Sequence, residues 1–210
     1  MLPYLEIPAQ NKERAVMIWL HGLGADGGDL EPVAEMLGIS GLKHIFPDAP
    51  VRPVTINGGM RMRAWYDIAE SDFYSGMGDE SGLMASADAV SELVAHFLRP
   101  RTHVLIAGFS QGGAVALAVG LKRLENLAGV IAMSSYVPQF LKTGKCYKPP
   151  IFMAHGTRDQ VVLPDWGRAS RDWLNTEGFT VSWREYPMAH VICQEEIQDM
   201  AEWVDQTLAQ

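Results

Sequence analysis

The sequence predicts an α/β fold built on a mostly parallel central sheet with helices on both of its faces. Short apolar runs rich in β-branched residues alternate along the chain with segments in which apolar residues recur every three or four positions. Strands of a parallel sheet are covered on both faces, so they read as continuous apolar runs. The chain has 210 residues, 48% of them hydrophobic, and no long linker-like stretch, which predicts one domain over residues 1–210.

Six segments are predicted to be strands of this sheet. Five are apolar runs, and the sixth alternates between polar and apolar residues. In chain order they are Ala15–Leu20, His44–Phe46, His103–Ala107, Gly129–Met133, Ile151–Ala154 and the alternating Thr180–Tyr186. Ligands of such sheets bind beyond the carboxyl ends of the strands, so we expect the functional site there.

Helices are predicted between and after these strands. Leu83–Leu98 and the C-terminal residues around Ile197–Leu208 each carry one apolar stripe, and Gln111–Leu121 is rich in alanine. Two other segments are irregular: Asp48–Met62 contains prolines and the pair Gly58-Gly59, and Ala69–Gly82 contains three glycines among small and acidic residues. These residues exclude long regular elements. We interpret both as walls or lids of a binding site, with a plain surface loop as the alternative for each.

The charge and the cysteine content exclude several classes of function. A formal net charge of −8 at pH 7 argues against binding to nucleic acid or to an anionic membrane surface, so small or neutral partners are expected. Cys146 and Cys193 are too few for a disulfide framework and lack metal-ligand spacing, which predicts a reducing compartment and no metal site. The N-terminal residues lack the pattern of a secretion signal, so a soluble, cytoplasmic protein is expected.

The segment Gly108–Gly112, with the sequence GFSQG, matches the G-x-S-x-G turn that presents a nucleophilic serine. A strand is predicted directly before this turn and a helix directly after it. Such a turn strains the backbone of the serine, and glycines beside it relieve the crowding between strand and helix. The motif therefore predicts that Ser110 attacks an acyl carbonyl; a glycine-rich turn without catalysis is the alternative.

A serine hydroxyl needs a histidine that takes up its proton and a carboxylate that orients this histidine. His190 is the predicted base, because it follows the last predicted strand and fits the chain order serine, acid, histidine. His155 has no credible acid between it and the serine, although both it and His21 are expected at the carboxyl edge of the sheet. The remaining histidines, His44, His96 and His103, are expected to be structural or solvated.

Asp159 is the predicted acid of the site. It lies just beyond the carboxyl end of the predicted strand Ile151–Ala154, on the same edge of the sheet as Ser110. Three other acidic residues between Ser110 and His190 have different expected places: Asp165 and Asp172 belong to a helical pattern, and Glu125 belongs to a helix-end turn. The competing role for Asp159 is that of a helix N-cap, a position at which aspartate is common for structural reasons.

Two backbone N–H groups are expected to stabilise the oxyanion of a tetrahedral intermediate. One belongs to the residue after the nucleophile, Gln111, and the other to a loop after an early strand. The glycine-rich loop His21–Gly28 follows the first predicted strand, and Leu23 is the candidate second donor. Phosphate binding is the alternative for this loop, but the G-x-G-x-x-G spacing and the Walker lysine–serine pair are both missing.

Five segments of the chain, in order, resemble the phospholipase/carboxylesterase family of small serine hydrolases, which includes bacterial carboxylesterases and acyl-protein thioesterases. The resemblance extends over nearly the whole chain. The segments are His21–Asp26, Ala49–Thr55 through Ala64–Ile68, Gly108–Gly113, His155–Asp159 with Val161-Val162, and Met188–His190.

The resemblance implies an α/β-hydrolase fold without a large cap domain and without a cofactor. It implies Ser110, Asp159 and His190 as the catalytic triad, and Leu23 and Gln111 as the oxyanion hole. It also implies an apolar acyl groove beside the serine, for which the candidate residues are Met62, Trp65, Phe73, Tyr136 and Val162. The segment from Glu70 to Gly82 carries no matching family motif, so it leaves the lid and the acyl-chain preference open.

The function expected from these residues is hydrolysis of carboxylic ester or thioester bonds, with a carboxylesterase as the first hypothesis. An acyl-protein thioesterase and a lysophospholipase present the same carbonyl and are alternatives. A small serine peptidase with the same triad and a hydrolase-like binding protein without catalysis are further alternatives. No cysteine near the N-terminus offers an acylation site, so no stable membrane insertion is expected, and apolar loop residues such as Phe73 and Tyr74 are compatible with a weak homodimer.

Overall fold

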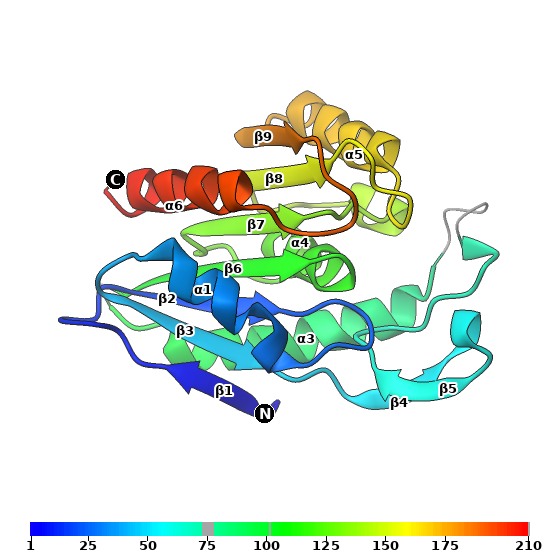
Figure 1. Ribbon diagram of the computed structural model, residues 1–210, viewed down its shortest axis with the longest axis horizontal. Helices are drawn as coiled ribbons and strands as arrows, with labels where there is room; N and C mark the ends of the chain where they lie inside the picture. The colour runs from blue at the N-terminus through cyan, green and yellow to red at the C-terminus, as the bar shows by residue number, and fades with distance from the viewer. Residues whose placement is uncertain (73–77, 101, 210) are drawn as a thin grey trace.

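The computed structural model of the protein describes residues 1–72, 78–100 and 102–209. Its centre is a seven-stranded sheet with the strand order β1-β3-β2-β6-β7-β8-β9 (Figure 1). The strands are β1 (Tyr4–Ile7), β2 (Ala15–Leu20), β3 (Leu42–Pro47), β6 (His103–Phe109), β7 (Gly129–Met133), β8 (Ile151–Gly156) and β9 (Val181–Tyr186). β1 is antiparallel to β3, and the other neighbours are parallel, which confirms the mostly parallel sheet.

Helices cover both faces of this sheet, as predicted. They are α1 (Glu31–Leu37), α3 (Glu80–Phe97), α4 (Gln111–Lys122), α5 (Pro164–Thr176) and α6 (Gln194–Leu208). In Figure 1, α1 and α6 lie in front of the sheet and α3 and α4 lie behind it. Buried residues of α3, α4 and α5 form one apolar cluster with the sheet, here called the α3–α5 cluster, and those of α1 and α6 form the α1–α6 cluster on the opposite face.

The strand β2 shows how one apolar run serves both clusters. All six of its residues are buried, and successive side chains point to opposite faces. Val16, Ile18 and Leu20 belong to the α3–α5 cluster, and Ala15, Met17 and Trp19 belong to the α1–α6 cluster. The helix α4 is buried on all sides from Gln111 to Leu121, so its sequence is rich in small residues and lacks a single apolar stripe.

The sequence prediction missed β1 and α1, which are both short. β1 has four residues, lies at the edge of the sheet and is only partly buried, so its apolar signal is weak. α1 has seven residues and follows the 3-10 turn η1 (Gly27–Leu30) directly. It ends at Gly38, which has the left-handed conformation (φ 64°) that favours glycine at this position.

The segment Asp48–Met62, together with the next residue Arg63, contains a hairpin of two four-residue strands. They are β4 (Val51–Val54) and β5 (Met60–Arg63), joined through the 3-10 turn η2 (Thr55–Asn57). The prediction that this segment lacks long elements holds, but the hairpin itself was missed because Pro53 suggests a break. An isolated two-stranded ribbon consists of edge strands, in which proline is tolerated. The hairpin lies at the carboxyl ends of the parallel strands (Figure 1), which places it beside the expected site.

A buried carboxyl group in the first turn of α6 is not part of any predicted site. Glu196 is 0% exposed, and this burial raises its pKa to about 8 from the ordinary 4.5. The folded protein therefore keeps this proton up to about pH 8, whereas the unfolded chain releases it near the ordinary glutamate value. Because the folded state holds more protons in this window, its stability falls as the pH rises through it.

We expect Glu196→Gln to remove this pH dependence. The free energy of unfolding of the wild type should fall relative to that of the variant by up to about 1.4 kcal/mol per pH unit across the window. Urea unfolding at pH values between those of the ordinary and the raised pKa measures the difference. Glu195→Gln, at the exposed neighbouring position, is the matched control and should follow the wild type. If the free energies of unfolding of the wild type and of Glu196→Gln differ by the same amount at every pH, the pH dependence does not come from the carboxyl group of Glu196.

Candidate active site

Ser110 is the single residue between the end of β6 at Phe109 and the start of α4 at Gln111. Its backbone has φ 54° and ψ −117°, a conformation that non-glycine residues rarely adopt and that persists only where the surroundings hold it. Its N–H donates to the carbonyl of Met133 at 2.9 Å, and its own carbonyl accepts from Ser135 Oγ at 2.8 Å. These bonds fix the strained turn at the carboxyl end of β6, where the sequence predicted it.

The glycines of the motif allow β6, β2 and α4 to approach one another closely. A Cβ atom on Gly108 would lie 2.2 Å from the carbonyl oxygen of Gly112, and a Cβ on Gly112 would lie 2.1 Å from that of Leu20. Both contacts are with backbone, which cannot rotate away as a side chain can. The two glycines are therefore needed for packing as much as for the turn itself.

We expect Gly112→Ala to destabilise the protein by about 3 kcal/mol, because α4 must move away from β2 to admit the methyl group. The midpoint of urea unfolding at unchanged slope measures this loss. Gly78→Ala is the matched control, since no atom of the described residues lies within 4 Å of a Cβ at that position. Equal stability of the two variants would contradict the close packing of the elbow.

Asp159 and His190 form a hydrogen-bonded pair across 31 positions of the chain. His190 Nδ1 lies 2.7 Å from Asp159 Oδ2, and the Asp159 side chain is fully buried. An ionised carboxylate only accepts hydrogen bonds, so Nδ1 carries the proton and Nε2 has a free lone pair. The His190 ring also packs on Phe109, the residue before Ser110, with ring centroids 4.7 Å apart.

The other oxygen of Asp159 holds the turn that leads into α5. Oδ1 accepts from the N–H groups of Val161 at 2.8 Å and Val162 at 3.0 Å. The alternative role of Asp159 as a helix N-cap is wrong, because α5 begins at Pro164 and its N-cap is Leu163. Hydrogen bonds to both oxygens thus fix the carboxylate in one orientation.

His21 and His155 lie at the carboxyl edge, as expected, but their contacts are structural. His21 Nε2 accepts from the N–H of Ala49 at 3.1 Å, so its Nδ1 donates to the carbonyl of Gly22 at 2.7 Å. His155 Nε2 lies 2.8 Å from the carbonyl of Val162, to which it donates. Burial lowers the pKa of both histidines, which keeps them neutral.

The candidate oxyanion donors lie on two different elements beside Ser110. The N–H of Gln111 opens α4, and that of Leu23 belongs to the loop after β2. Within the described part of the chain, neither N–H has a protein acceptor. The Leu23 loop is anchored by Gly24, whose N–H donates to the carbonyl of Arg63 in β5 at 2.9 Å. Both N–H groups are thus available to a ligand.

The side chain of Gln111 has a positioning role that the sequence analysis missed. Its Oε1 accepts from the N–H of Trp65 and its Nε2 donates to the carbonyl of Tyr66, both at 2.8 Å. The amide thereby ties the segment after β5 to the first turn of α4. No sequence signal indicates this contact, because it joins residues 45 and 46 positions apart.

A cavity of about 380 Å³ brings most of the predicted site residues together. Ser110, His190, Leu23 and Gln111 line it, as do the groove candidates Tyr136 and Val162. Apolar and aromatic residues that the sequence analysis did not single out complete the wall; they include Ile56, Tyr66, Ile68, Phe109 and Val161. Asp159 lies behind His190, buried and outside the lining.

Two other groove candidates, Trp65 and Met62, do not line this cavity. Trp65 is fully buried, and its Nε1 donates to the carbonyl of His21 at 2.9 Å. The sulfur atom of Met62 lies 3.2 Å from Asn57 Nδ2. Met62 is not among the described residues that line the cavity. Phe73 lies outside the described residues.

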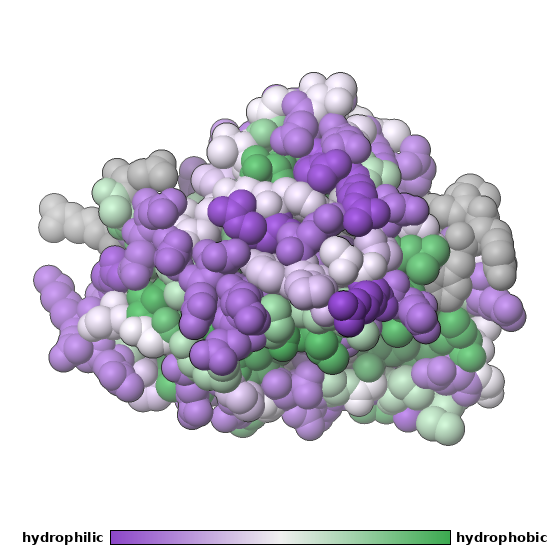
Figure 2. Space-filling view, turned by 45° about the horizontal axis from the view of Figure 1, so that its top comes forward, coloured by the Kyte–Doolittle hydropathy of each residue, from purple (hydrophilic) through white to green (hydrophobic). Residues whose placement is uncertain are grey.

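Several apolar side chains are exposed on the surface near the site. Exposed apolar side chains there include Ile56 at 39%, Val161 at 59% and Val191 at 52%. In the view of Figure 2, hydrophobic surface gathers in the lower right part, and the upper part is mostly hydrophilic. Among the described residues, no helix has the length and hydropathy that a membrane span requires.

Comparisons with known proteins agree over almost the entire chain. A model of the phospholipase/carboxylesterase family matches residues 5–208. Acyl-protein thioesterase 1 of Yarrowia lipolytica is 35% identical over 223 residues, which cover 98% of this chain and 97% of that protein. Carboxylesterase SOBER1 of Arabidopsis thaliana is 35% identical over 210 residues, with 93% and 91% covered. The crystal structure of Zea mays acyl-protein thioesterase 2 superimposes with a TM-score of 0.86 at 26% identity and covers 99% of this chain and 100% of that one.

Proposed function

The chain belongs to the phospholipase/carboxylesterase family, and from that premise we propose that it hydrolyses carboxylic esters or thioesters with Ser110 as the nucleophile. The mostly parallel sheet and the helices on both faces confirm the α/β-hydrolase fold, and the described residues contain no large cap domain. We assign His190 as the general base and Asp159 as the group that orients it.

In the first step of the proposed reaction, Ser110 Oγ attacks the carbonyl carbon while His190 Nε2 takes up the hydroxyl proton. The tetrahedral intermediate collapses when His190 returns this proton to the leaving oxygen or sulfur, and an acyl-serine ester is left. A water molecule then attacks this ester with His190 as base, which releases the carboxylic acid and restores Ser110. Asp159, at 2.7 Å from Nδ1, stabilises the imidazolium that forms in each half-reaction.

The oxyanion of each intermediate is assigned to the N–H groups of Leu23 and Gln111. Each such donor contributes roughly a hundredfold to a thousandfold to kcat in known hydrolases. Their lack of protein acceptors in the described part of the chain supports this assignment.

The observation that carries the proposal is the arrangement of the strained serine and the oriented histidine in one cavity. Ser110 and His190 line the same 380 Å³ space, and the buried Asp159 carboxylate fixes the tautomer of the histidine. A surface histidine or a plain glycine-rich turn would require neither a buried carboxylate nor a strained backbone.

The proposal is tested by comparing cleavage of p-nitrophenyl butyrate, a butyryl thioester and a peptide p-nitroanilide by the purified protein. We expect rapid cleavage of the ester and the thioester and much slower cleavage of the anilide, because the amine is the poorer leaving group. Preferred cleavage of the anilide would reverse the assignment in favour of a peptidase. Failure to cleave any of the three would favour a hydrolase-like binding protein.

The relatives support two acyl substrates in particular. A curated relative is an acyl-protein thioesterase and another is a carboxylesterase, so we propose a free ester first and an S-acylated protein second. A lysophospholipid presents the same carbonyl and is a third candidate. The ratio of ester to thioester cleavage at equal acyl length decides between the first two.

We further propose that the protein works in the cytoplasm on small acyl substrates, without nucleic acid and without stable membrane insertion. Both cysteines are free thiols, which suits a reducing compartment. A homodimer is proposed on the basis of the exposed apolar residues around the cavity, such as Val161. Sedimentation at several protein concentrations tests it, and a constant monomer mass would contradict it.

A further inference from the structure

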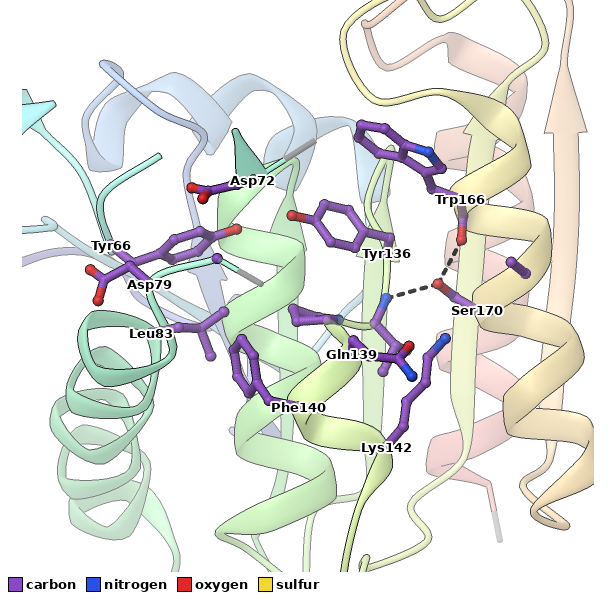
Figure 3. A pocket seen from close by; sticks show the side chains of 14 residues that line it. Tyr66, Asp72, Asp79, Leu83, Tyr136, Gln139, Phe140, Lys142, Trp166 and Ser170 are labelled. Carbon is purple, nitrogen blue, oxygen red and sulfur yellow. Dashed lines mark hydrogen bonds between the residues drawn. The ribbon is translucent and has the colours of Figure 1, made fainter. Parts of the chain in front are cut away.

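The catalytic cavity shares a wall with a second cavity. Tyr66 and Tyr136 line both the catalytic cavity and a cavity of about 190 Å³ between α3 and α5. Figure 3 shows this second cavity with Leu83 of α3 on one side and Trp166 and Ser170 of α5 on the other. The two phenol rings stand between these helices, and their hydroxyl groups point toward each other.

The second cavity is suited to an apolar ligand. Most of its lining is apolar or aromatic, from Leu83, Val137, Pro138, Phe140, Trp166 and Ala169. Its two carboxylates have backbone partners: Asp72 accepts from the N–H of Ala69 at 2.7 Å, and Asp79 accepts from the N–H groups of Gly82 at 2.8 Å and Asp67 at 3.0 Å. They therefore do not need a cationic ligand, and the space fits an alkyl chain.

The two tyrosines form an uncharged partition between the cavities. Tyr66 is 5% exposed, and its carbonyl is held by Gln111 Nε2 at 2.8 Å. The Tyr136 ring packs edge-on against Trp166 with centroids 5.6 Å apart. Burial raises the pKa of both phenols, so both keep their protons at neutral pH. Tyr66 is the fixed half of the partition, and Tyr136, which is only partly buried, is the half that a substitution can remove.

The position of His190 decides which end of a substrate faces this partition. The leaving group must lie beside His190, which returns the proton to it. The His190 ring packs on Phe109, which borders the α1–α6 cluster, whereas Tyr66 belongs to the α3–α5 cluster on the opposite face of the sheet. With the carbonyl at Ser110, the acyl chain extends away from His190 and toward Tyr66 and Tyr136.

We infer that the cavity between α3 and α5 is a distal binding site for the acyl chain, and that Tyr66 and Tyr136 restrict access to it. The inference rests on the proposed function, because it assigns the two ends of an ester substrate. In the wild type the rings stop a growing acyl chain at the wall of the catalytic cavity, so kcat/KM falls for long chains. Once the partition is open, each methylene that enters the second cavity raises kcat/KM by roughly fourfold.

The test measures kcat/KM for p-nitrophenyl butyrate and p-nitrophenyl decanoate with the wild type and with Tyr136→Ala. We expect the decanoate-to-butyrate ratio to rise by roughly tenfold or more in the variant. Tyr136→Val opens the same wall and replaces the alanine variant if circular dichroism shows that the latter is unfolded. An unchanged ratio in the folded variant overturns the inference.

Two further variants test whether a raised ratio comes from opening the partition or from a general loosening of the site. Tyr136→Phe keeps the ring, so its ratio should stay close to that of the wild type. Ala169→Phe fills the second cavity, so adding it to Tyr136→Ala should return the ratio toward the wild-type value. An equal gain in Tyr136→Phe, or a gain that survives Ala169→Phe, overturns the inference.

The same measurements distinguish this inference from the proposed function. A wild type that cleaves p-nitrophenyl butyrate, together with an unchanged ratio in Tyr136→Ala, overturns the distal site alone. A wild type that cleaves no ester contradicts the proposed function as well. Acetate esters of alcohols of increasing length should show no gain in Tyr136→Ala, and a gain confined to that series would place the leaving group in the second cavity and overturn the assignment.

Discussion

Replacing Ser110 with alanine is expected to lower kcat for ester hydrolysis by roughly a millionfold, because the nucleophile and its base act as a unit. The variant keeps a Cβ atom at the strained position, so the turn with φ 54° should fold as in the wild type. Initial rates on p-nitrophenyl butyrate, with circular dichroism as the check on folding, measure the effect. The residual rate should come from the oxyanion donors and substrate binding alone.

Ser91→Ala is the matched control for this substitution. Ser91 lies in α3, where its hydroxyl donates to the carbonyl of Ala87 at 2.6 Å, and it does not line the catalytic cavity in the described part of the chain. Its activity should equal that of the wild type. A Ser110→Ala protein that keeps more than a tenth of the wild-type rate would end the assignment of Ser110 as the nucleophile.

Replacing Asp159 with asparagine is expected to lower kcat by roughly ten-thousandfold while the fold is kept. The asparagine oxygen can still accept from the N–H groups of Val161 and Val162, which now bond to Asp159 Oδ1. Its NH2 group then faces His190 Nδ1 where the carboxylate oxygen lies at 2.7 Å, and two donors cannot share a hydrogen bond. His190 must adopt the other tautomer, which places a proton on Nε2 and removes the base.

Asp165→Asn tests whether the loss of any carboxylate in this part of the chain lowers kcat in the same way. Asp165 lies in the first turn of α5, and its exposed side chain pairs with Arg168 at 2.8 Å. A surface pair of this kind contributes little, so the variant should retain wild-type activity. An Asp159→Asn enzyme as active as Asp165→Asn would show that the buried pair does not orient the base.

The residues placed best by the sequence are those that follow strands of the parallel sheet. Ser110 follows β6, Asp159 follows β8 and His190 follows β9, and the carboxyl ends of parallel strands meet at one edge. Apolar runs locate β6 and β8 to within a few residues, and the alternating segment Thr180–Tyr186 locates β9. Site residues that follow strand ends can therefore be predicted from the sequence, even when two partners lie 31 positions apart, as Asp159 and His190 do.

The cavity wall was placed less well, because irregular segments have no period that tells which side chain faces inward. Trp65 was chosen for the groove, yet it is fully buried, and its neighbour Tyr66 lines the cavity instead. The orientation of both is set by Gln111, whose side chain bonds to their backbone from a distant part of the chain.

The position of Glu196 could have been read from the helix period. It lies four residues before Met200 and thus on the same apolar stripe of α6, which also contains Val204. Its place in this period, rather than its charge, agrees with its burial. A charged residue at a position of an apolar stripe therefore predicts a buried ionisable group.

Mass spectrometry of the protein after reaction with a fluorophosphonate tests the central claim most directly, because only an activated serine reacts with this reagent. We predict one covalent adduct per folded chain, located on the peptide that contains Ser110, and no adduct after unfolding in urea. The adduct should form far more slowly in Asp159→Asn, because His190 then lacks its orienting partner. A folded protein that stays unlabelled, or that is labelled at a serine other than Ser110, would contradict the account.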